Sequence, residues 1–166
     1  MPLCLVVVLS ACGYHVAGRA DRLPPDVKTI AVPAFVNLSS RYKIEQTLAR
    51  AVTRELMERT RFRVTADPSQ ADAVLKGTVK DVQAGVVSFD ATTGRANSLQ
   101  VVVTASVALV DQHSKKVLFS NPNYTFHEEY EISSSNSQLF EEDAPALERL
   151  SRDLAKTLVT DILENY

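Results

Sequence analysis

Cysteine and glycine are scarce in this chain, and it has no long hydrophobic run. Only two cysteines and five glycines occur among the 166 residues, and the net charge is −2. The glycines at positions 77, 85 and 94 are too dispersed to form a phosphate-binding loop. A chain with more acidic than basic residues is also not built to neutralise the phosphates of a nucleic acid. These shortages argue against a nucleotide-binding loop and against nucleic acid as a partner.

Groups that could carry out catalysis are equally sparse. The segment His127–Glu131 is the best candidate for a metal site, but no second histidine stands at helical spacing and no cysteine accompanies it. We therefore interpret it as a solvated strand end. The serine-rich segment Ser133–Ser137 has no histidine or lysine partner that would activate a nucleophile. The sequence predicts a protein that is not an enzyme and holds no metal or cofactor.

The first twelve residues indicate export. An apolar run from Leu3 to Leu9 has the length of a signal-peptide core and is too short to span a bilayer. It ends in Leu9-Ser10-Ala11-Cys12, which resembles the bacterial lipobox: an apolar residue, two small residues and a cysteine. We expect residues 1–11 to be a lipoprotein signal peptide and Cys12 to be the acylated residue. The alternative interpretation is a buried N-terminal strand.

Cleavage before Cys12 would leave no second cysteine for a disulfide, and several acyl chains on one residue anchor a protein durably to a membrane. The next residue is Gly13 and not aspartate, which favours the outer membrane over retention at the inner membrane. We expect residues 12–25 to form a lipidated tether and residues 26–166 to form a single domain facing the periplasm.

The hydrophobic pattern predicts two amphipathic helices and several strands. Apolar residues recur every three or four positions in two stretches, at Ile44, Leu48, Val52 and Leu56 and again at Leu147, Leu150, Leu154, Leu158 and Ile162. Between these stretches, residues 29–36, 62–64, 74–87, 101–110 and 117–126 favour strands, and the third of these is interrupted by glycines that suggest bulges.

Two helices with one apolar stripe each bury those stripes most simply on one face of a shared sheet. The predicted fold is therefore an α+β two-layer sandwich, with two amphipathic helices on a mixed, mostly antiparallel sheet of about four strands. The opposite face of the sheet would carry Val102, Ala108 and Val110. Either a partner covers these side chains, or they stand singly among polar neighbours and need no cover.

The chain resembles the LptE family of lipopolysaccharide-assembly lipoproteins over most of its length. The likeness begins at Cys12-Gly13-Tyr14-His15 and continues through the segments Pro25–Asn37, Leu56–Val64 and Ala71–Val79. The resemblance implies a non-enzymatic protein that plugs the outer-membrane β-barrel LptD, helps that barrel to assemble and contacts lipopolysaccharide. The alternative is a periplasmic accessory lipoprotein, an activator or a secretion-channel component, that does not bind lipopolysaccharide.

Contact with a phosphorylated glycolipid requires cations beside apolar surface. Because the chain is acidic overall, local groups of basic residues must supply them. Two loops qualify: one carries Arg95, and the other carries Lys115 and Lys116. Successive hairpin loops point in opposite directions, so we expect these sites to lie at opposite ends of the sheet. Basic residues that keep hairpins soluble are the alternative interpretation.

Overall fold

The computed structural model describes residues 23–131 and 143–164, so Cys12 and the Ser133–Ser137 segment lie outside it. The elements are the strands β1 (Thr29–Ala31) and β2 (Val36–Asn37), the helix α1 (Ile44–Arg59), the strand β3 (Arg63–Thr65), a 3-10 turn η1 (Pro68–Gln70), the long strands β4 (Ala73–Phe89), β5 (Ala96–Asp111) and β6 (Val117–Glu131), and the helix α2 (Asp143–Glu164).

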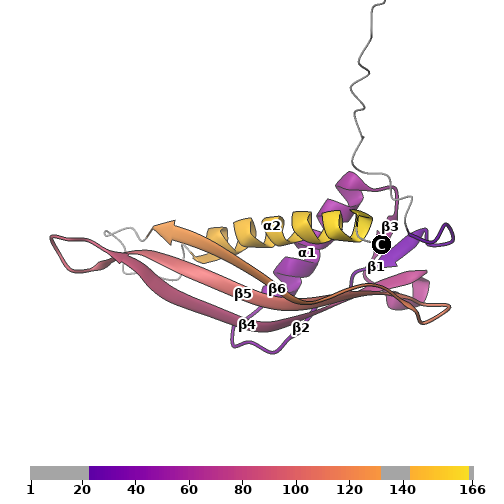
Figure 1. The fold of residues 1–166 in the computed structure, drawn as a ribbon, viewed down its shortest axis with the longest axis horizontal. Helices are drawn as coiled ribbons and strands as arrows, with labels where there is room; N and C mark the ends of the chain where they lie inside the picture. Colours follow the sequence, from indigo (N-terminus) through magenta and orange to yellow (C-terminus); the bar gives the residue numbers. More distant parts are fainter. Residues whose placement is uncertain (1–22, 132–142, 165–166) are drawn as a thin grey trace, which may run out of the picture.

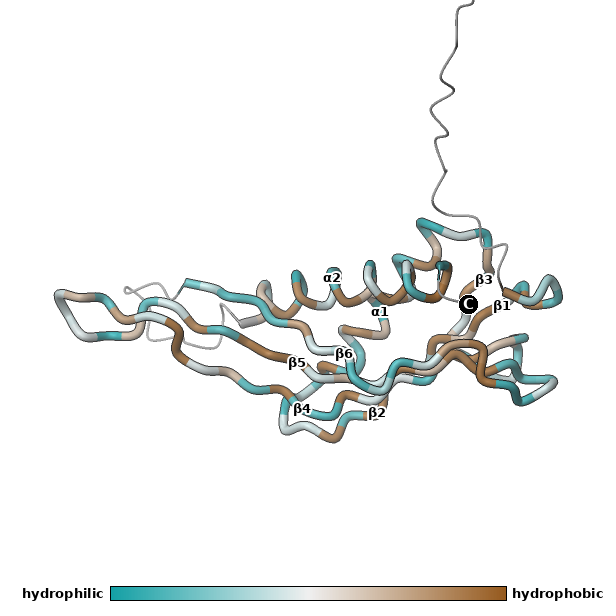
Figure 2. Tube along the Cα trace, in the orientation of Figure 1, coloured by the Kyte–Doolittle hydropathy of each residue, from teal (hydrophilic) through white to brown (hydrophobic). Residues whose placement is uncertain are grey.

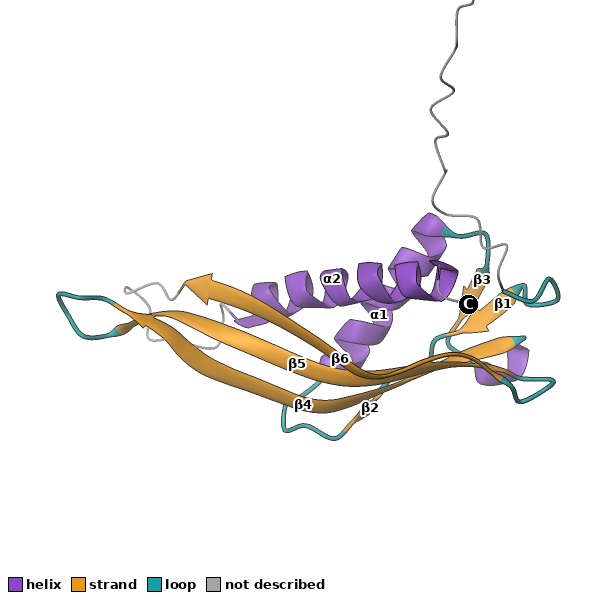
Figure 3. Cartoon of the chain, viewed as in Figure 1, coloured by secondary structure: helices purple, strands orange, loops and turns teal. Residues whose placement is uncertain are grey.

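These elements form two layers, with both helices on one side of a twisted, curved sheet (Figure 1; Figure 3). The strand order is β3-β1-β4-β5-β6, and β2 pairs with β4. The three long strands are antiparallel, while β1, β2 and β3 pair in parallel. The predicted α+β sandwich is confirmed, with six strands in the sheet instead of about four. The number differs because the stretch predicted as one strand over 29–36 divides into β1 and β2, with Pro33 in the break, and the short strand expected at 62–64 also joins the sheet, as β3.

The stripe of α1 is buried as predicted, since Ile44, Leu48, Val52 and Leu56 are all in the core. The start of this helix has no capping side chain, although Ser39 and Ser40 stand shortly before it. The N-cap is Lys43, which has a left-handed backbone (φ 63°) and makes no capping hydrogen bond through its side chain. The Ser39 hydroxyl instead accepts a hydrogen bond from the Arg41 N–H at 3.2 Å, within the turn before the helix.

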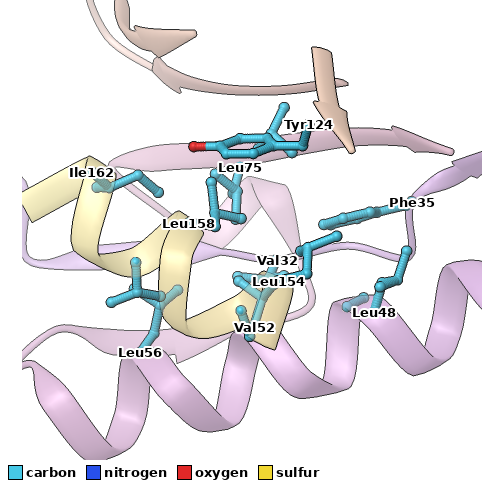
Figure 4. Packing of buried hydrophobic residues seen from close by; sticks show 14 of the residues in the cluster. Val32, Phe35, Leu48, Val52, Leu56, Leu75, Tyr124, Leu154, Leu158 and Ile162 are labelled. Carbon is cyan, nitrogen blue, oxygen red and sulfur yellow. The ribbon is translucent and has the colours of Figure 1, made fainter. Parts of the chain in front are cut away.

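Helix α2 contributes the larger share of the core. Its predicted stripe is buried, and Ala146, Ala155, Val159 and Leu163 widen it. Figure 2 shows hydrophobic and hydrophilic residues alternating along this helix, and Figure 4 shows Leu154 close to Val52 of α1. The Tyr124 hydroxyl of β6 donates a hydrogen bond to the Asp161 carboxylate at 2.5 Å, which ties the helix to the sheet. Within the described ranges, no helix has the length and hydropathy needed to cross a membrane.

The glycines of β4 do not mark the bulges that the sequence suggested. The irregularities in the β4–β5 pairing fall between Val79 and Asp81 and between Val86 and Phe89. Gly77 has a different role, because a Cβ atom placed on it would lie less than 3.0 Å from the ring of Phe35. The missing side chain lets this aromatic ring lie flat on the strand within the core.

Asp72 joins the start of β1 to the start of β4. Its carboxylate accepts hydrogen bonds from the backbone N–H groups of Lys28 at 2.9 Å and Thr29 at 2.8 Å. These two bonds, the Lys28 bond first, lower the pKa of Asp72 below its ordinary value. Hydrogen bonds to a carboxylate stabilise its charged form, so this contact depends on ionised Asp72.

We expect Asp72→Ala to lower the free energy of unfolding by about 1–3 kcal/mol at neutral pH, because two backbone donors lose a charged acceptor. Since the folded-state pKa is lowered, the stabilisation is present above the pKa of the unfolded chain and is lost as the pH falls through the folded-state value. Urea unfolding at neutral and at strongly acid pH should show the difference between wild type and variant shrinking in acid. Asp26→Ala, which removes an exposed carboxylate in the turn before β1, is the control and should have little effect at either pH.

Candidate functional site

The loop between β4 and β5 is a tightly bonded turn at the end of a long hairpin. The Asp90 carboxylate accepts hydrogen bonds from the N–H groups of Thr92 at 3.0 Å and Thr93 at 2.7 Å. The Asp90 N–H donates to the Arg95 carbonyl at 2.8 Å, and Gly94 supplies the left-handed residue (φ 66°) that closes the turn. The bonds from Thr93 and Thr92 lower the pKa of Asp90, so the carboxylate that organises this loop stays ionised. The loop therefore fixes the backbone of Arg95.

Arg95 lies beside apolar surface at this tip. Its side chain is exposed and has no hydrogen bond or ion pair within the residues the structure describes. Phe89 pairs with Ala96, the residue after Arg95, and is 63% exposed. Val86 and Val87 are about half exposed nearby on the same strand, because the hairpin reaches past the end of the helix layer (Figure 1). A cation and a group of uncovered apolar side chains thus share one end of the molecule.

The turn between β5 and β6 repeats the same design. The Asp111 carboxylate accepts from the N–H groups of His113 at 2.8 Å and Ser114 at 2.7 Å, and Lys115 takes the left-handed position (φ 59°). Lys116 occupies the place that Arg95 has in the first loop. The ammonium group of Lys115 donates to Gln112 at 2.9 Å, and Val117 is the exposed large apolar residue that follows. This turn offers cations but has less apolar surface beside them than the loop between β4 and β5.

The two basic sites are far apart. They lie at opposite ends of β5, a strand of 16 residues, as Figure 1 shows. Such a strand is roughly 50 Å long at the usual rise per residue. The structure therefore does not bring Arg95 together with Lys115 and Lys116, and one pocket cannot use both.

The face of the sheet opposite the helices is polar, and the charged residues Lys76, Asp81 and Glu129 pair across the strands with its uncharged ones. Along β5 the odd-numbered residues from Val101 to Asp111 are buried under the helices, and the even-numbered residues between them are half-buried on the open face. Cross-strand pairing places hydroxyl, amide and small side chains together there: Thr78, Gln83, Gln100, Val102, Thr104, Ser106, Ala108, Ser120 and Thr125. No element of residues 23–131 or 143–164 covers this face (Figure 3).

The apolar residues of the open face mostly stand alone. Val102 lies between Gln83 and His127, and Ala108 lies between Lys76 and Ser120. Only Val110, between Val74 and Val117, belongs to an apolar row, at the end near the β5–β6 turn. The central part of the face therefore presents polar side chains, and its isolated apolar residues need no separate partner.

The segment His127–Glu131 does not come together as a metal site. His127 and Glu129 alternate with Glu128, and Glu128 turns to the helix side and binds the guanidinium of Arg149. Within the part of the chain that the structure describes, no group of three or more histidine, cysteine or acidic side chains could hold a metal ion.

Sequence reasoning identified the basic loops but missed the apolar tip. Val86, Val87 and Phe89 belong to a β-rich run that reads as an ordinary half-buried strand. Their exposure follows from the length of the hairpin relative to the helices, which no local pattern encodes. The indication available in the sequence was the length of this strand, which extends well beyond the two helices.

Comparison with known proteins identifies one family. The family model LptE, described as lipopolysaccharide-assembly, matches residues 27–162, which include every strand and nearly all of both helices. No curated protein matches the chain.

Several solved structures share the fold at low sequence identity. An uncharacterized lipoprotein B from Nitrosomonas europaea is 14% identical, with a TM-score of 0.52, over 84% of this chain and 88% of that one. A protein from Xanthomonas campestris is 14% identical, with a TM-score of 0.52, over 82% of this chain and 84% of the other. A hypothetical protein from Chlamydia trachomatis is 10% identical, with a TM-score of 0.52, over 84% of this chain and 99% of that one. At these identities the likeness concerns the arrangement of helices and strands alone.

Proposed function

Since this chain belongs to the LptE family of lipopolysaccharide-assembly proteins, we propose that it acts without catalysis, as a lipid-anchored plug that helps an LptD-type outer-membrane β-barrel to assemble. In this role it takes part in moving lipopolysaccharide to the outer leaflet. The proposed anchor is the acyl group on Cys12, which holds the domain on the periplasmic side of the outer membrane.

The open face of the sheet is the observation that carries this proposal. The interior wall of a large outer-membrane barrel is polar, whereas its outer wall is apolar. A domain that sits inside such a barrel needs a broad, polar surface of side chains that can form hydrogen bonds with that wall. The central open face, with Thr78, Thr104, Ser106 and Thr125, has this character.

Contact with the glycolipid is proposed for the β4–β5 tip. Arginine can bind a phosphate through two parallel hydrogen bonds, and acyl chains need apolar surface. Arg95 supplies the free guanidinium, and Phe89, Val86 and Val87 supply the uncovered apolar side chains beside it. Lys115 already donates to Gln112 and has less apolar surface nearby, so we assign it and Lys116 to keeping their turn soluble.

Depletion of the protein in its own host tests the plug role. We expect the amount of correctly assembled barrel and the amount of lipopolysaccharide in the outer leaflet to fall together, because an empty barrel lacks its folding partner. Quantitative blots of the barrel in outer-membrane fractions and surface labelling of the glycolipid measure the two effects. The barrel should also co-purify with the full chain after extraction in mild detergent. Unchanged barrel and glycolipid levels would instead favour the accessory-lipoprotein function.

Binding of purified lipopolysaccharide to the full chain in mild detergent tests the tip. We expect Arg95→Asp combined with Phe89→Ser to weaken binding by about tenfold or more, since a charged hydrogen bond and an apolar contact are both lost. The matched control is Lys115→Asp with Lys116→Asp, which changes charge in the equivalent turn and should leave the affinity near that of wild type. Equal binding by all three folded proteins would show that neither loop makes the contact.

A further inference from the structure

A groove lies between the two helices, away from the open face of the sheet. It has a volume of about 360 Å³ and is formed by one side of each helix. The lining residues are Thr47, Arg50, Ala51 and Arg54 from α1 and Ala144, Glu148, Ser151 and Arg152 from α2. Residues almost one hundred positions apart in the sequence therefore meet here, and three of the eight are arginines.

The two helices are held together at their other ends. The guanidinium of Arg59, in the last turn of α1, donates to the Thr160 hydroxyl at 2.7 Å and to the Lys156 carbonyl at 3.4 Å. These contacts join the C-terminal parts of the helices and leave the groove along their N-terminal and middle parts. The small side chains Ala51, Ala144 and Ser151 in its lining leave room that larger residues would fill.

The arginines of the groove lack the acidic partners that other arginines of the helices have. Arg149 pairs with Glu128, and Arg59 pairs with Glu55 at 3.4 Å. Arg54 and Arg152, in contrast, make no hydrogen bond or ion pair with any residue of the described ranges. Arginines lining a shared groove repel one another, and this repulsion is relieved when an anion binds between them.

The third arginine of the groove is held in place by its own helix. The guanidinium of Arg50 donates to the Gln46 carbonyl at 3.3 Å and to the Thr47 hydroxyl at 3.4 Å. A guanidinium carries five N–H groups, so these two bonds leave donors for a ligand. Glu148 is the single carboxylate of the lining, and the groove therefore has a net charge of +2 in a chain of net charge −2.

We propose that this groove binds a phosphate-bearing anion, gripped by Arg54 from one helix and Arg152 from the other, with Arg50 contributing a third guanidinium. The planar fork of arginine matches the oxygens of a phosphate, and two forks from opposite walls can bind the same group. The groove lies on the helix layer, whereas Arg95 lies at the tip of a hairpin, so this site is separate from the glycolipid contact proposed above. The phosphate can belong to a lipid headgroup or to a small soluble compound.

Titration of the full chain in a non-ionic detergent, followed by ³¹P NMR, tests the site. The two probes are inorganic phosphate and glycerophosphoglycerol, the water-soluble headgroup of an anionic phospholipid. We expect saturable binding of at least one probe and an affinity about tenfold lower for the Arg54→Gln/Arg152→Gln double variant, which loses the two charged donors. Arg61→Gln/Arg63→Gln is the matched control, because it removes the same charge from exposed positions outside the groove. This control should bind as wild type does.

Glu148→Gln tests the groove in the opposite direction, since removing the only carboxylate of its lining should tighten binding. Binding of both probes indicates a site open to lipid headgroups, and binding of inorganic phosphate alone indicates a soluble ligand. The proposal is overturned if neither probe binds the wild type or if both double variants lose affinity equally. It is also overturned if a hexaglutamate peptide binds in the groove and neither phosphate probe does, because the ligand would then be an acidic protein segment. An unchanged melting temperature shows that a variant is still folded, so that its change in affinity comes from the groove.

Discussion

Leu154→Ala is expected to lower the free energy of unfolding by about 2–5 kcal/mol, the range for removing a large aliphatic side chain from a packed core. Leu154 is completely buried, and it lies where α2 meets both α1 and the sheet (Figure 4). Its neighbours there come from separate elements and cannot all move to fill the space that the substitution leaves. The measured loss of stability should therefore include most of the lost transfer free energy of the side chain and most of the cost of the cavity.

Urea unfolding followed by circular dichroism measures this effect. Thr157→Ala is the matched control, because Thr157 is exposed on the same helix and alanine is at least as favourable there. The control should therefore stay close to wild type or be slightly more stable. A change of less than about 0.5 kcal/mol for Leu154→Ala, the level of an ordinary surface substitution, would contradict the packing described above.

The sequence was sufficient for the helices because their periodicity is visible residue by residue. Leu48, Val52 and Leu56 on α1 and Leu150, Leu154 and Leu158 on α2 all lie in the core, as their spacing indicated. The alternation from Val101 to Asp111 in β5 likewise gave both the strand and its buried face. In each case the local repeat and the burial have the same cause, namely one face of an element turned to the core.

Features that depend on distant contacts could not be predicted. Strands were expected at 29–36 and 62–64, but β1, β2 and β3 are only two or three residues long, so no pattern in them indicated how they divide or that they pair in parallel. The left-handed conformations of Lys43 and Lys115 are imposed by the turns around them, in residues that rarely adopt it. The helix groove unites Arg54 with Arg152, and only the packing of α1 on α2 brings them together.

The same holds for the candidate tip. Arg95 was recognisable as a basic residue in a polar loop, and the position of its loop at one end of the sheet followed from hairpin geometry. No sequence pattern indicates that the apolar side chains beside it are exposed, since valines in a strand, such as Val86 and Val87, ordinarily indicate burial. Their exposure comes from a hairpin that extends beyond the helices, which bury residues only in the first part of β4, from Ala73 to Val79.

Gly77→Ala is expected to be destabilising by about 1–3 kcal/mol, the usual cost of forcing an extra methyl group into a packed core. Alanine is normally better than glycine within a strand, so the sign of this effect depends on the ring of Phe35. The new Cβ would lie less than 3.0 Å from three atoms of that ring, and Phe35 is itself buried. Either the ring or β4 must move, and both are held by the core.

A double-mutant cycle identifies the ring as the cause. Phe35→Ala alone should cost about 3–5 kcal/mol, but in that background Gly77→Ala should be neutral or stabilising, because the methyl group then enters space that the ring has left. The coupling energy between the two positions should be about 1–3 kcal/mol, well above the error of such cycles. Gly85→Ala is the matched control on the same strand, since nothing lies within 4 Å of its Cβ position. It should be neutral or slightly stabilising, and a loss as large as that of Gly77→Ala would mean that β4 requires glycine for its backbone and not for the approach of Phe35.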